Sequence, residues 1–274
     1  GRFVAARAQL DSVPQEFHKG QYLLYLALSI YGEGDGRIDT EAFLAAFRKA
    51  SLADLKAEDL PWLAMLDGLA AELEGKAEVA SAAYQRALEL TDQPMLRSHF
   101  EGLIMRQKLL ASSTDEALVA ELRVKIDQLD GQAAAYPFVQ EYAVGLYGLG
   151  RIGEAIDAID RELENTSAGY VSEEREQLGL LKGIILGANS EIGRVALKTL
   201  ILNGQGRETM GIALQLLARV PNQDVDLLNF LKVVLSRNEP HLLQGQMYYL
   251  RSQLAMKMAQ QGSVEERVGL MAIA

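Results

Sequence analysis

The run from Asp35 to Asp39 is the segment whose residue types most suggest chemistry. Its first aspartate is followed by a glycine and, two residues after that glycine, by an apolar residue, which is the composition found at the centre of a calcium-binding loop. In that register the first ligand would be Tyr31 and the bidentate twelfth ligand would be Ala42, so both anchoring carboxylates are missing. We therefore expect a turn between helices here, with Asp39 capping the helix that follows.

A glycine-rich stretch overlaps this segment, from Gly32 to Gly36. A phosphate-binding loop would need a preceding strand and a Lys-Ser/Thr pair, and neither is present. The carboxylates of Glu33 and Asp35 would also repel an anion. We predict no phosphate site.

No residue pattern predicts a catalytic or metal centre. His18, His99 and His241 lie in different segments, and none has a second ligand at a metal-binding helical spacing. No Gly-x-Ser-x-Gly or His-Glu-x-x-His motif occurs, and Glu72 and Glu74 are expected to be solvated on a charged helix face. The chain has no cysteine, which excludes disulfides and thiolate chemistry. We therefore predict a non-enzymatic protein with no cofactor and no metal.

Composition narrows the possible partners. The 274 residues carry a net charge of −10, and the acidic excess lies in residues 1–189. An acidic surface repels phosphate backbones, so we expect no nucleic-acid partner. The longest apolar stretches, 22–31 and 183–188, are far shorter than the roughly 18 to 20 residues of a membrane-spanning helix. We therefore expect no membrane-spanning segment.

Small or apolar residues recur every 37 or 38 residues, and each begins a segment that has the pattern of the second helix of a helical hairpin. Strict alternation of apolar and polar residues is absent, and the six prolines lie mostly between helical segments, so the chain is predicted to be all-helical. A period of this length indicates a solenoid in which each hairpin packs on its neighbours. The recurring residues are Ala6, Phe43, Ala80, Ala117 and Ala155.

The pattern continues without a linker, so we predict one repeat array over residues 1–274. Residues 1–12 have the pattern of the second helix of a truncated repeat. We therefore expect further residues before Gly1 in the complete protein. Residues 239–262 are expected to form a capping helix. Ser113, Thr114 and Ser190 are candidate helix caps. The predicted hairpins are 15–50, 61–94, 95–130, 136–165, 171–203 and 206–236.

The segment 61–94 resembles a tetratricopeptide repeat. Gly150 to Ile156 repeats the turn and second-helix start typical of this family, and residues 22–50 also resemble the related Sel1-like repeats, which have a longer glycine-rich loop. The period exceeds the usual 34 residues, and the first-helix pattern is only partly present. The resemblance implies an all-α, right-handed α-solenoid of antiparallel hairpins. The residues expected to pack the repeats are Gly68, Gly75, Ala80, Tyr84, Ala87, Gly150 and Ala155.

In this family the first helix of each hairpin lines the concave wall, where a peptide binds. Aromatic, Met and Arg side chains on such a wall are typical anchors. The side chains could instead pack between repeats, and the sequence does not decide between the two. The corresponding residues here are Trp62, Met65, Leu69 and Leu73, then His99, Leu103 and Arg106, then Gln140, Val144 and Tyr147, and finally Arg175, Leu178 and Lys182.

The function that the resemblance implies is a non-catalytic scaffold that holds a protein or peptide. The family's carboxylate clamp is not expected, since Trp62, Met65 and Leu69 stand at its positions, but Arg106, Arg175 and Lys182 could pair with an acidic group. Two alternatives remain: a self-associating structural segment that buries Phe3, Ala6 and Leu10, or the regulatory arm of a larger protein. Repeat proteins of this kind are frequent in bacterial envelopes, which slightly favours that location.

Overall fold

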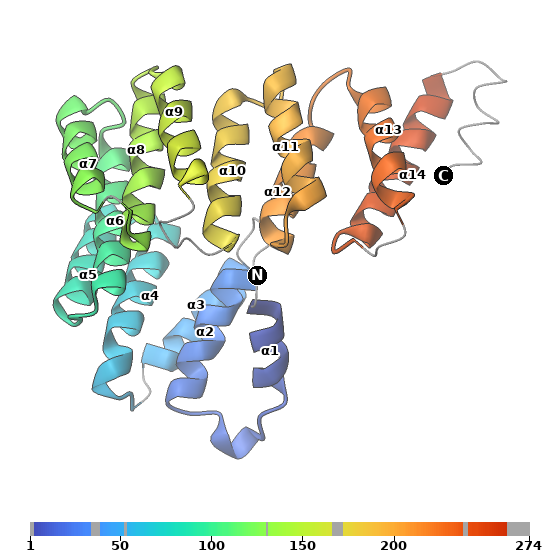
Figure 1. Ribbon diagram of the computed structural model, residues 1–274. Helices are drawn as coiled ribbons and strands as arrows, with labels where there is room; N and C mark the ends of the chain where they lie inside the picture. Colours follow the sequence, from blue (N-terminus) through green and yellow to red (C-terminus); the bar gives the residue numbers. More distant parts are fainter. Residues whose placement is uncertain are drawn as a thin grey trace. The chain divides into compact units, whose positions relative to one another are not determined.

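The computed structural model is all-helical over the residues that it describes, which are 3–33, 39–51, 54–129, 131–165, 172–237 and 241–261. Most of the α-helices pack mainly against their neighbours in the sequence, which confirms the predicted all-α, repeat-like architecture (Figure 1). None of the described helices combines the length and hydropathy needed to cross a membrane. The predicted turn residues before Asp39 lie outside the described residues.

The chain divides into two compact units, 1–178 and 179–274, and the boundary falls inside helix α10 (Ser172–Leu186). The second unit continues with α11 (Glu191–Asn203), α12 (Arg207–Ala218), α13 (Asp224–Leu235) and α14 (Gln244–Gln261). The first unit contains α1 (Phe3–Asp11), α2 (Gln21–Glu33), α3 (Thr40–Ser51), α4 (Leu60–Leu73), α5 (Ala77–Glu89), α6 (Pro94–Ala111), α7 (Glu116–Gln128), α8 (Tyr136–Gly148) and α9 (Ile152–Glu164).

The turn between α4 and α5 has the same backbone structure as the turn between α8 and α9. Gly75 and Gly150 both have a φ of +73°, a conformation that strongly favours glycine. After Gly75 the N–H of Lys76 donates to the carbonyl of Ala71 at 2.8 Å, and the N–H of Arg151 donates to Leu146 at 2.9 Å. These are Schellman caps, which end one helix and reverse the chain into the next.

Side-chain caps start three of the other helices. Asp39 Oδ1 accepts from the N–H of Ala42 at 2.9 Å, and Ser190 Oγ accepts from Gly193 at 2.9 Å, both as predicted. The cap of α7 differs from the prediction: Asp115, rather than Ser113 or Thr114, accepts from the first turn of the helix. Aspartate is among the strongest N-cap residues because its carboxylate also interacts favourably with the helix dipole.

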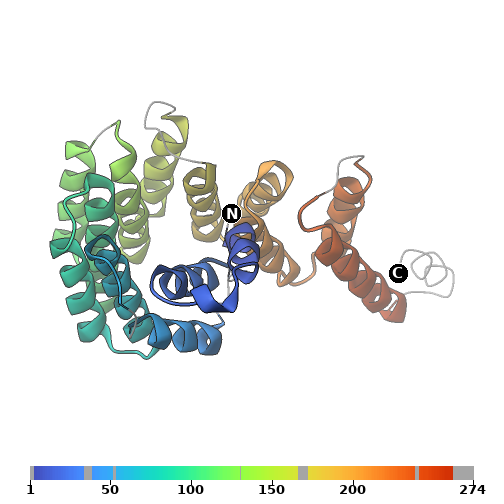
Figure 2. The same cartoon turned by 90° about the horizontal axis from the view of Figure 1, so that it is seen from below.

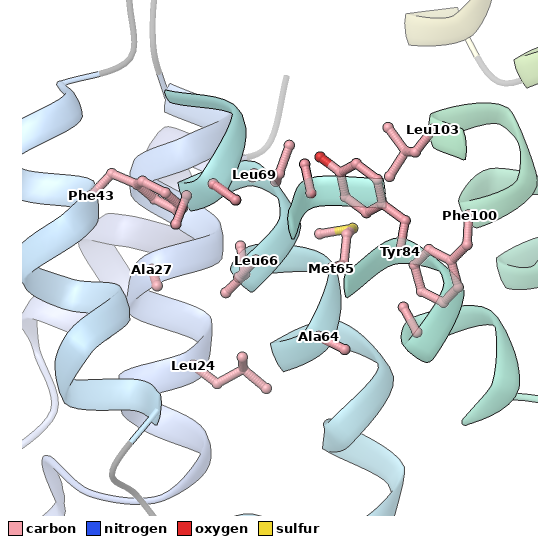
Figure 3. Close-up of a cluster of buried hydrophobic side chains, with 14 of the residues drawn as sticks. Leu24, Ala27, Phe43, Ala64, Met65, Leu66, Leu69, Tyr84, Phe100 and Leu103 are labelled. Carbon is pink, nitrogen blue, oxygen red and sulfur yellow. The ribbon is translucent and has the colours of Figure 1, made fainter. Parts of the chain in front are cut away.

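Close approach of α4 and α5 depends on Gly68. A Cβ atom at this position would collide with the ring of Tyr84, which is fully buried. Tyr84 lies between α4 and α6, near Met65, Phe100 and Leu103 (Figure 3). The glycine and the tyrosine therefore set the spacing between this hairpin and the next.

The second unit has its own core, built from α10 through α14. Leu197, Ile201 and Leu231 are fully buried there. Met247, Leu254, Ala255 and Ala259 are buried on α14, and α13 lies beside this helix (Figure 2). The N-terminal helix α1 likewise packs against α2.

Candidate functional site

A cluster of polar side chains joins the first helices of two successive hairpins. The Glu72 carboxylate on α4 accepts from the Tyr84 hydroxyl at 2.6 Å and from Arg106 Nη2 on α6 at 2.7 and 2.8 Å. Gln107 Nε2, also on α6, donates to the same carboxylate at 2.5 Å. One acid therefore holds donors from α5 and α6 together.

This cluster is half-buried, because the Glu72 and Arg106 side chains are 21% and 31% exposed. Burial disfavours the charged form of Arg106 and so acts to lower its pKa. The charge and hydrogen bond of the Glu72 carboxylate outweigh this effect, and the pKa of the guanidinium is raised. Burial and the adjacent carboxylate also raise the pKa of Tyr84. Glu72 is thus a paired acid inside a hydrogen-bond network, and the expectation that it is solvated is corrected; Glu74 is exposed and pairs with Lys76.

A cavity of about 160 Å³ lies next to this cluster, between α6 and α8. Gly145 allows close packing beside it, because a Cβ atom there would lie 2.7 Å from Val119 and 3.3 Å from Leu109. The lining is mostly apolar, with Arg106 and Glu141 as its two charged groups. The residues that line it are Arg106, Leu109, Leu110, Ser113, Glu141, Val144 and Gly145.

Glu141 is the unusual group in this cavity. It is partly buried, and within the described part of the chain it has no hydrogen-bond or ion-pair partner. Burial raises the pKa of its carboxyl to about 7; the charge of Arg106 opposes this rise and that of Glu72 adds to it. A carboxyl with a pKa near 7 is about half protonated and half ionised at neutral pH.

Two of the residues that line the cavity are exposed apolar side chains, and a third exposed side chain lies one helical turn away. Leu110 on α6 is 72% exposed, and Val144 on α8 is 42% exposed. Tyr147, one helical turn after Val144, is 49% exposed. We call Leu110, Val144 and Tyr147 the rim. Apolar side chains beside a cavity with polar groups are characteristic of binding sites.

Several residues predicted to line the wall lie in the core instead. Met65, Leu69 and Leu103 are 4%, 3% and 8% exposed, and Leu178 is fully buried. Their apolar stripe packs against neighbouring helices, so these side chains do not line an open wall. Leu73, near the end of α4, is 38% exposed.

Trp62 also packs between hairpins. It is partly buried, and its ring meets that of Phe100 on α6 edge to face at 6.3 Å between centroids. Of the two interpretations that the sequence left open for Trp62, the structure favours packing. His99, beside Phe100, is exposed on α6.

The remaining predicted groove residues have separate surroundings. Arg175 donates to the carbonyl of Leu163, which ties α10 to α9. Lys182 belongs to the second unit and has its own interaction partner. Gln140 is partly exposed on α8. Only Arg106 and Val144 of the predicted groove residues line the cavity, with Tyr147 on its rim.

The other two histidines have structural contacts. His18 donates from Nε2 to the carbonyl of Val13 at 2.7 Å. His241 accepts from the N–H of Leu243 at Nδ1, so its Nε2 donates to the carbonyl of Ile201 at 2.8 Å. Across the described residues, no three His, Asp or Glu side chains are grouped so that they could hold a metal ion.

A second cavity, of about 200 Å³, lies where α3 meets the α4–α5 hairpin. Its acids are already paired: Asp67 with Arg86 at 2.5 Å, and Glu74 with Lys76 at 2.7 Å. Paired charges have less to gain from a charged ligand, so we regard the cavity between α6 and α8 as the candidate site.

Sequence reasoning missed Glu141 and misjudged Glu72. For Glu72 a signal existed, because Arg106 follows it by 34 residues, one repeat length of the resembled family, and opposite charges at that spacing can pair across successive hairpins. Glu141 had no such signal, since its burial depends on how α6 lies against α8.

No family model, curated protein or solved structure matches this chain.

Proposed function

We propose that this chain is a non-catalytic scaffold that binds a peptide segment of a partner protein along α6 and α8. In this proposal the hairpins form a right-handed, tetratricopeptide-like solenoid. The observation that carries the proposal is the cavity between α6 and α8 with its exposed apolar rim. Rigid hairpins would present this surface without being ordered on binding, which lowers the entropic cost of association.

The rim and the cavity have complementary roles in this proposal. Leu110, Val144 and Tyr147 would contact apolar side chains of the peptide, since covering exposed apolar area is favourable. Tyrosine is a frequent anchor because its ring supplies a large contact area at a low entropic cost. The cavity would take one side chain of the peptide and so determine its register.

A peptide-display screen on the purified protein tests this proposal. Peptides from a random library would be measured by fluorescence anisotropy against the native chain and the double variant Val144→Ser, Tyr147→Ala. We expect the variant to bind at least about tenfold more weakly, which corresponds to about 1.4 kcal/mol.

The matched control is Val124→Ser. Val124 is 54% exposed on α7, so the chemical change is the same on a different helix. Equal losses of affinity in the double variant and in Val124→Ser would argue against a site on the rim. A library that gives no binding peptide would count against the proposed function as a whole.

Self-association is a second candidate, supported by the exposed face of α14. Tyr249 is 67% exposed there, and Tyr248 and Met256 are 41% and 45% exposed. Sedimentation velocity over a range of concentrations tests it. A mass that rises with concentration and falls back in Tyr249→Ser would support this candidate, whereas a constant monomer mass would remove it.

A further inference from the structure

The two charged groups of the α6–α8 cavity differ in whether they have an ion-pair partner. Arg106 is already neutralised by two contacts with Glu72, at 2.7 and 2.8 Å. Glu141 has no partner among the described residues. When Glu141 is ionised, the trio of Glu72, Arg106 and Glu141 carries a net charge of −1, and that charge faces the cavity.

The cavity walls suit a side chain with an apolar stem. Leu109 and Leu110 line it from α6, and Val144 and Gly145 line it from α8. Lysine and arginine have such stems and carry their charge at the far end. A cationic end beside Glu141 would supply the missing partner, while the stem covered the leucine and valine side chains.

We propose that the cavity between α6 and α8 takes a lysine or arginine side chain of the bound peptide, with its cationic end paired to Glu141. This inference rests on the proposed function and adds the chemistry of the ligand. An acidic ligand fits less well, because the guanidinium of Arg106 is already bound to Glu72 and Glu141 would repel a second anion.

Binding at this site is expected to depend on pH. The charged groups that act on Glu141 are Arg106 on α6 and Glu72 on α4. Because the carboxyl of Glu141 has a pKa of about 7, it is mostly protonated at pH 6 and mostly ionised at pH 8. Affinity for a cationic side chain should therefore rise about tenfold across this range.

A double-mutant cycle tests the pairing. In the tightest peptide from the display screen, each lysine or arginine would be replaced by norleucine, which keeps the stem and removes the charge. We expect one replacement to weaken binding to the native chain at least tenfold at pH 8, and to have no further effect on Glu141→Gln. Glu121→Gln, at an exposed position on α7, is the control and should behave like the native chain.

The outcomes separate this inference from the proposed function. If peptides bind at the rim without a basic residue, or if Glu141→Gln leaves the norleucine effect unchanged, the inference is refuted and the scaffold proposal stands. If no peptide binds, the scaffold proposal fails. The cavity is then tested by measuring the pKa of Glu141 from its carboxyl ¹³C signal in the presence of n-butylammonium or butyrate. A lower pKa of Glu141 with n-butylammonium alone would support a cation site; a response only to butyrate, or to neither probe, would overturn it.

Discussion

Replacing Glu141 with glutamine should change how the stability of the first unit depends on pH. The pKa of this carboxyl rises from 4.5 to about 7 on folding, mainly because the group is buried. Between these two values the folded chain binds more protons than the unfolded chain, so the native protein loses stability as the pH rises toward 7. Glutamine does not titrate, so the variant lacks this loss.

The size of the effect follows from the shift. Each pKa unit corresponds to 1.36 kcal/mol, so the full shift is worth about 3 kcal/mol. Between pH 5 and pH 8.5 the stability of Glu141→Gln relative to the native chain should therefore increase by about 2 to 3 kcal/mol. At pH 5, where Glu141 is mostly protonated, the two proteins should differ little.

Urea unfolding followed by tryptophan fluorescence measures this difference. Trp62 is the only tryptophan of the chain and lies in the same unit as Glu141, so its emission reports on that unit alone. Urea is preferred to guanidinium because it does not screen charges. Glu121→Gln should show no comparable gain. A difference between native and Glu141→Gln that stays constant from pH 5 to pH 8.5 would refute the reasoning.

Four further substitutions, one of them a control, test the packing of the first unit by the same unfolding assay or by fluorescence. Gly68→Ala should destabilise the fold by about 1 to 3 kcal/mol because the new methyl group meets the ring of Tyr84. Gly153→Ala, with open space around it, is the control and should be neutral or stabilising by up to about 1 kcal/mol. Equal effects of the two substitutions would contradict this prediction. Tyr84→Phe should cost about 1.5 kcal/mol through loss of its hydrogen bond to a carboxylate, and an unchanged midpoint would contradict that. Trp62 emission should be blue-shifted and resist iodide in the native chain, and should shift to the red in Phe100→Ala; a red, readily quenched native emission would place the indole on an open wall.

The helices could be predicted from the sequence because their signals are local. Gly75 and Gly150 end their helices through their own backbone conformation, and Gly68 and Tyr84 stand at a fixed spacing on adjoining helices. The predicted hairpin 61–94 overlaps α4, which begins at Leu60, and spans α5. Local signals of this kind do not depend on distant parts of the chain.

The candidate site could be predicted only in part, because it depends on how hairpins pack. An apolar stripe on a first helix looks the same whether it faces a groove or a neighbouring helix, and Met65 faces a neighbour. The sequence predicts Arg106 and Val144 as groove residues, but it does not predict Glu141, the acid that lines the same cavity. The burial of Glu141 arises from the contact of α6 with α8, which no short stretch of sequence encodes.

The Glu72 carboxylate has a consequence for how the first unit unfolds. In repeat-like chains each hairpin contacts mainly its neighbours, so cooperativity depends on the coupling between adjacent hairpins. Glu72 holds Tyr84 of its own hairpin and Arg106 and Gln107 of the next, so neither hairpin can open without leaving half-buried polar groups unpaired. We expect α4 through α6 to exchange their amide hydrogens as one protected block, while opening begins elsewhere in the unit.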